Sequence, residues 1–336
     1  MGNRAWKYWL IASVLAAALW AAGSSNAEEA AQPRSFNSQV PFYVYAVVGE
    51  VDQLVGETPS AQTLTIPPCK WWYVEPRPPV DMEKVRREVE AQAIPGLKLA
   101  DAMDADLERL EGLTGLHYLD LSLTQISDAG LEHLKGLTGL QYLDLPSQVR
   151  DAGLEHLKGL TALQSLNLAG TQVTELGLEH LKGLTVFQWG YIWGTQVTDA
   201  GLEHLKGLTA LQRLYIMGAP VTDAGLEHLK GLTALRDLNL AGTDVTGAGL
   251  ESLKGPTALQ RLDLSYTHVT DEGLEHLKGL TALQELYLRD TAVGDAGLEH
   301  LKGLTELRHL YLSGTKVTEA GVEELMKSLP NLYVRR

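Results

Sequence analysis

Apolar residues recur along most of this chain with a period of 24 residues. Successive copies of the pattern begin with the same short turn sequence, and their first residues are Leu113, Leu137, Leu160, Leu184, Leu208, Leu232, Pro256, Leu280 and Leu304. Only the second copy departs from this length, with 23 residues. A fixed step of this size is typical of a solenoid, in which each copy forms one coil stacked on the last.

A single copy, residues 160–183, reads LTALQSLNLAGTQVTELGLEHLKG. Leucines alternate with polar residues around Leu166–Leu168, which predicts a short strand with its leucines pointing inward. The later part of the copy predicts a short helix that starts at a Thr or Asp and directs Leu178 and Leu181 inward. Gly177 is expected to allow the close approach of a neighbouring helix, and Gly183 to close the helix in the left-handed conformation.

The two layers of such a coil have different natural spacings. Stacked strands lie ~4.8 Å apart, whereas packed helices need ~8–10 Å. Each coil must therefore turn relative to the last, and the stack forms an arc. We predict an α/β solenoid with a curved parallel β-sheet on its concave face and short helices on its convex face.

The spacing L-x-x-L-x-L-x-x-T-x-V in residues 163–173 resembles the leucine-rich repeat family, and the resemblance extends over residues 94–336. The Asn or Cys that usually follows the strand in this family is a Thr in most copies here: Thr124, Thr171, Thr195, Thr243, Thr267, Thr291 and Thr315. A Thr hydroxyl both donates and accepts, so we expect it to donate to a backbone carbonyl of the next coil and to accept from an amide. The copies are similar to those of bacterial leucine-rich repeat proteins and of F-box adaptors.

The segment before the repeats has a different composition. Arg4 and Lys7 precede an uncharged apolar run, and small residues follow up to Ala27. This layout predicts a secretory signal peptide over residues 1–27, with an uncleaved membrane anchor as the alternative. Residues 28–93 are interpreted as a linker and an N-terminal cap, with strands near 40–51 and 63–66 and a helix over 81–92. The adjacent Trp71 and Trp72 either belong to this cap or form a separate binding site.

The composition excludes several classes of function. The chain has 336 residues and a formal net charge of −14, and it lacks a basic stripe, so we do not expect it to bind nucleic acid. A single cysteine, Cys69, rules out an internal disulfide. The nucleophile, phosphate-binding and dinucleotide-binding motifs are absent. We therefore predict neither enzymatic activity nor a cofactor.

The sequence GLEHLKG occurs seven times and raises the question of a metal site. With the two leucines inward, its Glu, His and Lys point to solvent on the convex face. Histidines in successive coils lie ~8–10 Å apart, which does not supply the several ligands at ~2.0–2.1 Å that zinc requires. We interpret the following row as a solvated wall rather than a metal site: His133, His156, His180, His204, His228, His276 and His300.

The outward positions of the strands vary strongly between copies, whereas the exposed positions of the helices are nearly identical. Variation on one face indicates that the concave face is adapted to a ligand. The candidate ligand-binding residues form two clusters, the first being Trp189, Tyr191, Trp193, Arg213, Tyr215 and Met217, and the second Tyr287, Arg289 and Tyr311. Trp, Tyr and Arg dominate binding hot spots. However, Phe187 and Gly190 replace core leucines, so a tryptophan that turns inward to fill the void is an alternative for the first cluster.

Together these observations predict a non-enzymatic module that is secreted, or located in the periplasm or cell envelope, and that binds a protein on its concave face. The acidic start of this face, Asp120 and Asp144, favours positive charge on the partner. One alternative is a cell-wall glycan that stacks on the concave aromatic residues, and another is a structural spacer without a ligand. An F-box-like adaptor is disfavoured, because a signal and a Trp/Pro-rich segment stand where that family has its helical F-box.

Overall fold

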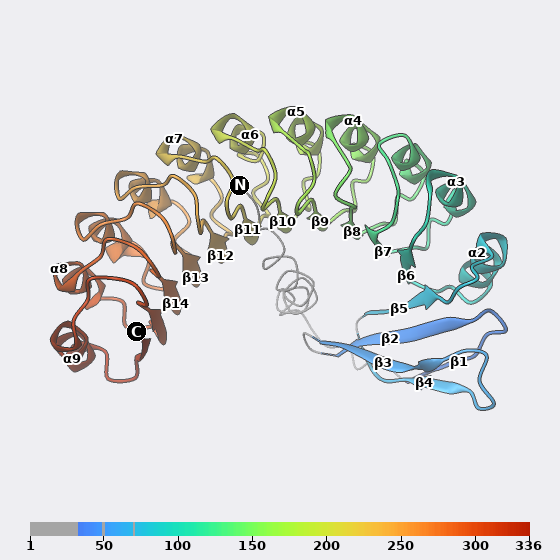
Figure 1. Ribbon diagram of the computed structural model, residues 1–336, viewed down its shortest axis with the longest axis horizontal. Coiled ribbons are helices and arrows are strands. Elements are labelled where there is room, and N and C mark those ends of the chain that lie inside the picture. The colour runs from blue at the N-terminus through green and yellow to red at the C-terminus, as the bar shows by residue number, and fades with distance from the viewer. Residues whose placement is uncertain (1–32, 49–50, 70) are drawn as a thin grey trace.

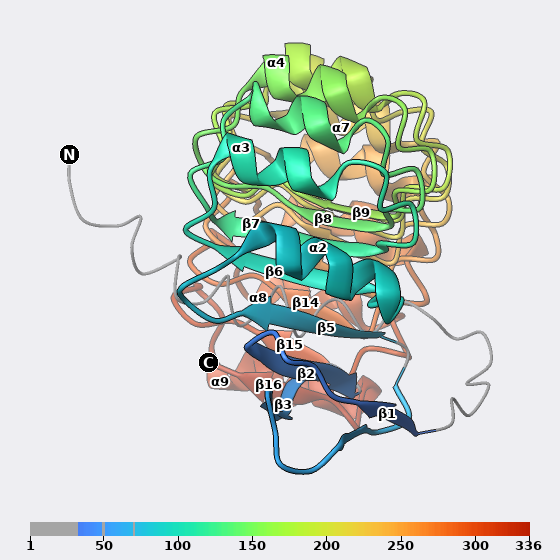
Figure 2. The same ribbon diagram turned by 90° about the vertical axis from the view of Figure 1, so that its right-hand side faces the viewer.

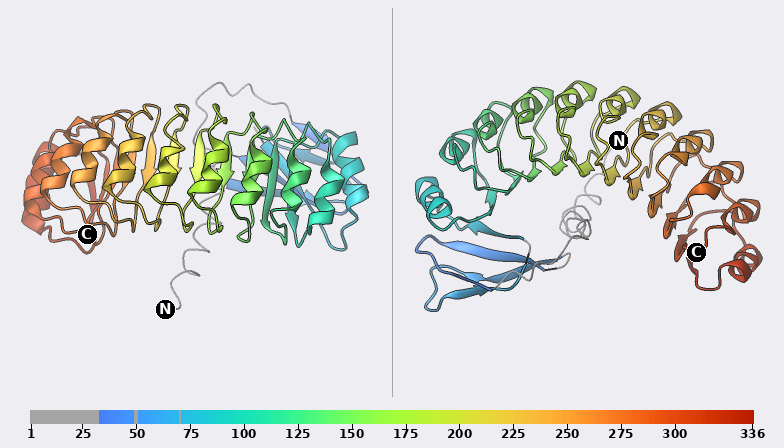
Figure 3. Two further views of the ribbon diagram at one scale, coloured as in Figure 1. Left: turned by 90° about the horizontal axis from the view of Figure 1, so that it is seen from above. Right: turned by 180° about the vertical axis from the view of Figure 1, so that it is seen from behind.

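The computed structural model describes residues 33–48, 51–69 and 71–336, so the predicted signal peptide lies outside the described residues. The coils stack into an arc whose strands line the inner side and whose helices line the outer side (Figure 1). Seen from above, the helices follow one another in a single row (Figure 3). The predicted α/β solenoid with a curved, mostly parallel sheet on its concave face is confirmed.

One sheet of 14 strands runs through the described part of the chain in the order β16-β15-β14-β13-β12-β11-β10-β9-β8-β7-β6-β5-β2-β3. The repeat strands are β6 (Gly96–Ala100), β7 (Tyr118–Leu123), β8 (Tyr142–Asp144), β9 (Ser165–Asn167), β10 (Trp189–Tyr191), β11 (Arg213–Tyr215), β12 (Asp237–Asn239), β13 (Arg261–Asp263), β14 (Glu285–Tyr287), β15 (His309–Tyr311) and β16 (Tyr333–Arg335). They pair in parallel, and Trp189 on β10 lies opposite Arg213 on β11. This constant register aligns the outward positions of successive copies into columns on the concave face.

Each copy carries a short helical segment on the convex side, most often one α-turn that continues into a 3₁₀ turn. The α-helices are α3 (Asp104–Leu107), α4 (Asp151–Leu154), α5 (Glu175–Leu178), α6 (Asp199–Glu203), α7 (Asp223–Leu226), α8 (Asp295–Leu298) and α9 (Glu319–Ser328). The 3₁₀ segments are η1 (Glu108–Leu110), η2 (Gly130–Leu134), η3 (Glu155–Leu157), η4 (Glu179–Leu181), η5 (Glu227–Leu229), η6 (Ala248–Lys254), η7 (Glu272–Gly279) and η8 (Glu299–Leu301). The prediction of a left-handed Gly183 is wrong, because the 3₁₀ turn leaves through Lys182 at φ −52° and the left-handed glycine of this copy is Gly170.

The leucines and valines of all coils form one continuous core between the sheet and the helices. Leu166, Leu178 and Leu181 are buried in it as predicted. Thr171, which recurs at the same position in most copies, has a local role, since its hydroxyl donates to the Leu168 carbonyl oxygen at 2.6 Å. The expected bond to the next coil is therefore wrong: each threonine closes the turn of its own copy.

Adjacent coils are joined where their helices start by a bond that the sequence analysis did not identify. The Asp151 carboxylate accepts from the backbone N–H of Thr174 through Oδ1 and from the Thr174 hydroxyl through Oδ2, both at 2.7 Å. The same arrangement joins Asp104 to Ser127, Asp199 to Thr222, Asp223 to Thr246 and Asp295 to Thr318. A Cβ on Gly177 would lie 2.6 Å from Asp151 Oδ1. The predicted close approach at Gly177 is thus confirmed, and the group that lies close to it is the Asp151 carboxylate.

The segment before the repeats extends the same sheet. It contains β1 (Arg34–Phe36), β2 (Phe42–Val48), β3 (Val51–Glu57), β4 (Leu64–Ile66), β5 (Trp71–Pro76) and α2 (Met82–Ala91). β5 pairs in parallel with β6, β2 pairs antiparallel with β5 and β3, and β1 pairs with β4 in a separate two-stranded sheet. Figure 2 shows this end of the molecule, with β2 and β3 beyond β5. The predicted strands and helix are confirmed, and Asp81 caps α2 by accepting from the Lys84 N–H at 3.2 Å.

Candidate functional site

The first predicted cluster lies on β10 and β11, where its rings pack on one another. The ring centroids of Trp189 and Tyr142 are 5.6 Å apart, and those of Tyr191 and Tyr215 are 5.2 Å apart, both in stacked geometry. Buried members are Trp189 (2% exposed), Tyr191, Arg213 and Tyr215, whereas Trp193 and Met217 are half-buried. These positions are less exposed than expected. Tyr191 and Tyr215 stand at equal positions of strands only ~4.8 Å apart, which brings their rings into contact and removes their faces from water. Trp189 and Tyr142 stand on the strands either side of β9, where the small Ser165 lets their rings meet.

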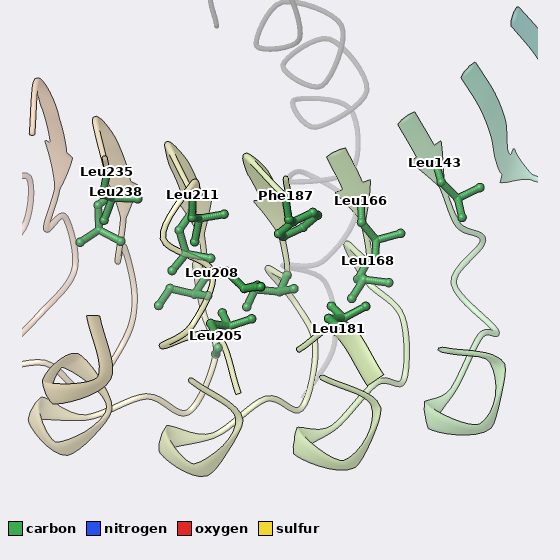
Figure 4. Packing of buried hydrophobic residues seen from close by; sticks show 14 of the residues in the cluster. Leu143, Leu166, Leu168, Leu181, Phe187, Leu205, Leu208, Leu211, Leu235 and Leu238 are labelled. Atoms are coloured by element: carbon green, nitrogen blue, oxygen red, sulfur yellow. The ribbon is translucent and has the colours of Figure 1, made fainter. Parts of the chain in front are cut away.

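The missing leucine at Gly190 is compensated by Phe187, not by a tryptophan. A Cβ built on Gly190 would lie 3.3 Å from Cε1 of the Phe187 ring. Figure 4 shows this ring in the row of core leucines, between Leu166 and Leu211. Phe187 is buried in the main core, while Trp189 belongs to the separate aromatic cluster on the concave side. The void left by the missing leucine is therefore filled by Phe187, and not by a tryptophan that turns inward.

Charged residues alternate in sign along the column that starts at Arg213 and pair across neighbouring strands. Arg261 on β13 lies between two carboxylates, 3.6 Å from Asp237 Oδ2 and 3.0 Å from Glu285 Oε1. Tyrosine hydroxyls complete the row, since Tyr215 donates to Asp237 at 2.6 Å and Tyr287 donates to Glu285 at 2.7 Å. Much of the variation in this column is thus complementarity between coils of the same chain.

The two carboxylates of this row differ in their affinity for protons. Burial raises the pKa of Asp237, although the Tyr215 hydroxyl donates to it and Arg261 lies nearby. Burial also acts on Glu285, but hydrogen bonds from Arg261 and Tyr287 outweigh it and lower the pKa of this carboxyl. The deeper burial of Asp237 and the shorter contact of Glu285 with Arg261 together explain the difference, because desolvation raises the pKa of a carboxyl and a charge-assisted hydrogen bond lowers it.

The second predicted cluster lies on β14 and β15 and is more open. The rings of Tyr287 and Tyr311 are stacked with centroids 4.2 Å apart and an interplanar angle of 3°, and both side chains are half-buried. Tyr333 on β16 is 57% exposed and meets His309 edge-on at 5.9 Å. Arg289 is exposed. This part of the concave face presents aromatic surface to solvent.

The turn after most repeat strands contains a residue in the left-handed conformation, and this residue is not glycine at Asp101, Tyr266 and Asp290. Glycine occupies this position with φ between 67° and 77° at Gly170, Gly194, Gly218, Gly242 and Gly314. The two copies between the last two of these have Tyr266 at φ 60° and Asp290 at φ 50°. A bulky side chain such as that of Tyr266 costs about 1–2 kcal/mol in this conformation, whereas an aspartate tolerates it. One coil thus holds a strained backbone, at Tyr266, at the rim of the concave face.

Tyr266 and Asp290 join the second cluster in one surface, which we call the C-terminal rim patch: Tyr266, Tyr287, Arg289, Asp290 and Tyr311. The Arg289 guanidinium carbon lies 5.4 Å from the centre of the Tyr266 ring, and Arg289 Nε lies 3.1 Å from Asp290 Oδ2. Tyr266 is 47% exposed. The sequence analysis missed Tyr266 and Asp290. Their signal was available, because both stand at the position where five other copies have glycine.

The opposite, N-terminal end of the concave face is acidic. Asp120 lies 3.4 Å from Lys98 Nζ, and Asp52 accepts from the Tyr73 hydroxyl at 3.1 Å. Burial would lower the pKa of Lys98, but the carboxylates around it, Asp120 first, raise it. Burial, reinforced by the charge of Asp120, raises the pKa of Asp144 well above its usual range. The carboxylates here outnumber the one lysine among them.

The two tryptophans of the N-terminal segment are divided between two environments. Trp72 is buried and packs against Phe36, with ring centroids 5.2 Å apart. Trp71 faces the concave side, where its ring meets that of Tyr142 at 5.2 Å. One indole therefore belongs to the core of this segment, and the other joins the aromatic cluster.

The GLEHLKG segments form the convex wall. Glu179 pairs with Lys182 at 3.3 Å within one turn, and equivalent pairs occur in the other copies that carry this sequence. Each such pair stabilises a helix by only ~0.2–0.5 kcal/mol. The histidines of the row are half-buried. Within residues 33–48, 51–69 and 71–336, no three His, Cys, Asp or Glu side chains are grouped closely enough to hold a metal ion.

The comparisons with known proteins agree with this architecture. Two family models, both described as leucine-rich repeat, match residues 257–317 and residues 113–135 and 231–254. The chain is similar to the solved structure of an internalin, InlF, from Listeria monocytogenes, with 24% identity, a TM-score of 0.61 and 76% of each chain covered. It is also similar to a leucine-rich repeat protein of Leptospira interrogans, with 18% identity, a TM-score of 0.54, and 76% of this chain and 68% of that one covered.

At these identities the two solved structures establish the fold alone. No curated protein sequence matches the chain. No helix in the described part of the chain has the length and the apolar content that a membrane crossing requires.

Proposed function

We propose, from the premise that this chain is a leucine-rich repeat protein, that it is a non-enzymatic module that binds another protein on its concave face. Solenoids of stacked repeats offer an extended concave surface that such proteins use for binding. The ligand-facing residues in this proposal are those of the C-terminal rim patch, together with the half-buried Trp193 and Met217 on earlier coils of the same face. The buried Trp189, Tyr191, Arg213 and Tyr215 lie on the strands that precede these two residues.

The strained backbone at Tyr266 carries the proposal. Five other copies show that glycine satisfies this turn without strain, so folding alone does not call for a tyrosine there. Strain of this kind clusters at sites where a side chain has a role beyond stability. The Tyr266 ring supports Arg289, and Tyr and Arg are the residues that most often anchor protein interfaces. A protein ligand with a carboxylate for Arg289 and an apolar edge for the Tyr287–Tyr311 stack matches this chemistry.

The test combines capture of partners with a stability measurement. The wild-type chain is expected to capture a protein from extracts of its native host, and Tyr287→Ala/Tyr311→Ala is expected to weaken that binding about tenfold or more, because two stacked anchors are lost. Tyr266→Gly is expected to weaken binding too, and at the same time to raise the free energy of unfolding by about 1 kcal/mol through relief of strain. Calorimetry on the chain and its captured partner measures the change in binding, and urea denaturation measures the change in the free energy of unfolding.

The control is Leu176→Ala, a substitution of a leucine that is 65% exposed on the convex helix α5. Equal loss of binding in this control and in the rim variants would contradict the proposed site. Quenching of tryptophan fluorescence by cell-wall oligosaccharides, without capture of a protein, would favour the glycan alternative, for which Trp193 and the tyrosines are the stacking surfaces. Failure of Tyr266→Gly to change binding would remove the role assigned to the strained turn.

We further propose that residues 1–27 export the chain to the cell envelope or the exterior. The arrangement of Arg4 and Lys7, the apolar run and the small residues that end at Ala27 supports it. N-terminal sequencing of the protein recovered from its native host is expected to begin at Glu28. A chain that begins at Met1 in an envelope fraction would indicate an uncleaved anchor, and recovery from the cytosol would contradict export.

A further inference from the structure

The last strand at the N-terminal end of the large sheet has an open side. β3 pairs with β2 along one side, and no strand of the described residues pairs with the other. In an antiparallel pair only alternate residues turn their N–H and C=O groups toward the partner, so the remaining residues of β3 turn theirs outward. Its seven residues span ~24 Å. A row of backbone donors and acceptors therefore faces away from the sheet.

The first half of β3 is open on both faces, where exposed apolar and polar side chains alternate in pairs: Val51 is 66% exposed and Leu54 is 50% exposed, with Asp52 and Gln53 between them. In the second half one face is covered, since a Cβ on Gly56 would lie 2.8 Å from Leu64 on β4. Proteins usually block such an edge with a lysine, a proline, a β-bulge or a very short strand. β3 contains neither lysine nor proline, and its bulge, at Val55, lies in its second half, whereas β16 at the opposite end of the sheet has only three residues.

The two faces of β3 differ in chemistry. Leu54 lies opposite Tyr45 on β2, and Tyr45 lies opposite Tyr73 on β5, so Leu54 and Asp52 are on the concave side with the acidic N-terminal end described above. Val51 and Gln53 are on the other side. Asp52 and Glu75 add negative charge around the concave side of the edge, while Glu57 is paired with Arg77 at 2.5 Å.

This charge decides between two occupants of the edge. A second copy of the chain would bring together two molecules that each carry a formal net charge of −14, and like charges repel. A basic segment would be attracted instead. We infer that the outer edge of β3 binds an extended segment of a partner protein in which basic side chains, facing Asp52, alternate with apolar side chains on the opposite face.

Binding in this mode is β-strand addition, where main-chain hydrogen bonds give affinity and alternate side chains give specificity. The added strand would extend the sheet beyond β3, at the end visible in Figure 2. This surface is distinct from the C-terminal rim patch, at the other end of the arc (Figure 1). The two sites can therefore be tested separately.

The experiment measures fluorescence anisotropy of a short labelled peptide of alternating valine and lysine, titrated with the full chain. Saturable binding is expected, and Leu54→Lys is expected to weaken it about tenfold or more, because the new lysine repels the basic side chains that lie on the same face of the peptide. The matched control is Leu176→Lys, the same substitution at a comparably exposed leucine of α5, which should leave binding unchanged. N-methylation of one alternate set of peptide nitrogens should abolish binding, and methylation of the other set should preserve it.

Three results would overturn the inference. A valine–glutamate peptide that binds as well as the valine–lysine peptide would remove the role of charge. Equal binding by both N-methylated forms would exclude strand addition. Concentration-dependent dimers in sedimentation, lost in Leu54→Lys and without peptide binding, would identify a second copy as the occupant. Tyr287→Ala/Tyr311→Ala should leave peptide binding unchanged, so failure of the concave-face proposal and failure of this one give different outcomes.

Discussion

Replacement of Phe187 by alanine is expected to lower the free energy of unfolding by about 3–5 kcal/mol, the usual effect of deleting a buried aromatic ring. The Phe187 ring fills the space of the leucine that Gly190 lacks. Without the ring, the fourth full copy of the repeat has neither the phenylalanine at position 187 nor a leucine at position 190. A cavity then opens, and the leucines of the two neighbouring coils cannot move in to fill it. Urea denaturation followed by circular dichroism measures the change.

A compensating pair makes this prediction specific. Gly190→Leu alone is expected to destabilise by about 1–3 kcal/mol, because the new side chain must enter space that begins 3.3 Å from the Phe187 ring. The double variant Phe187→Leu/Gly190→Leu restores the pattern of the other copies and should lie within about 1.5 kcal/mol of the wild type. If the effects of the single Phe187→Leu and Gly190→Leu changes simply added in the double variant, the two positions would not share one space.

Alanine at Gly177 is expected to lower the free energy of unfolding by about 2–4 kcal/mol, through overpacking and weakened hydrogen bonds to a charged group. The new Cβ would lie 2.6 Å from Asp151 Oδ1 and 2.9 Å from Val173 Cγ1. Asp151 would have to withdraw, and its bonds to the Thr174 N–H and hydroxyl would break. Denaturation of the full chain measures this effect as well.

Gly183→Ala supplies the matched control in the same copy. A Cβ on Gly183 would meet no atom within 4 Å, and Gly183 has no positive φ. Its substitution is expected to be neutral or slightly stabilising, since alanine reduces the freedom of the unfolded chain. Similar losses of stability at both glycines would show that contact with Asp151 is not what requires Gly177.

The period of the sequence was sufficient to predict the fold, because a solenoid is built from contacts between residues at fixed separations. The strand, the inward leucines and the convex wall all follow from one copy. Contacts between neighbouring coils were harder to predict. The bonds between Asp151 and Thr174 join residues of two copies, and the composition of one copy does not indicate which of its polar groups reaches the next.

The candidate site was predicted less well than the fold. Outward positions were correctly aligned in columns, so Trp189 and Arg213 do lie side by side. Their burial was not foreseen, because it arises from rings and charges of adjacent copies that satisfy one another. Tyr266 was missed because it belongs to a turn with an unusual backbone conformation, and the strand columns do not include turn residues.

The alternating charges of Arg213, Asp237, Arg261 and Glu285 restrict how the length of this solenoid can change. Nearly identical segments such as GLEHLKG favour unequal recombination of the gene, which removes or adds whole coils. Loss of residues 232–255 would place Arg213 beside Arg261, like charge against like. Loss of residues 232–279 would place Arg213 beside Glu285 and preserve attraction. In this stretch of the protein, therefore, we expect duplication or deletion of an even number of coils to be tolerated better than that of an odd number.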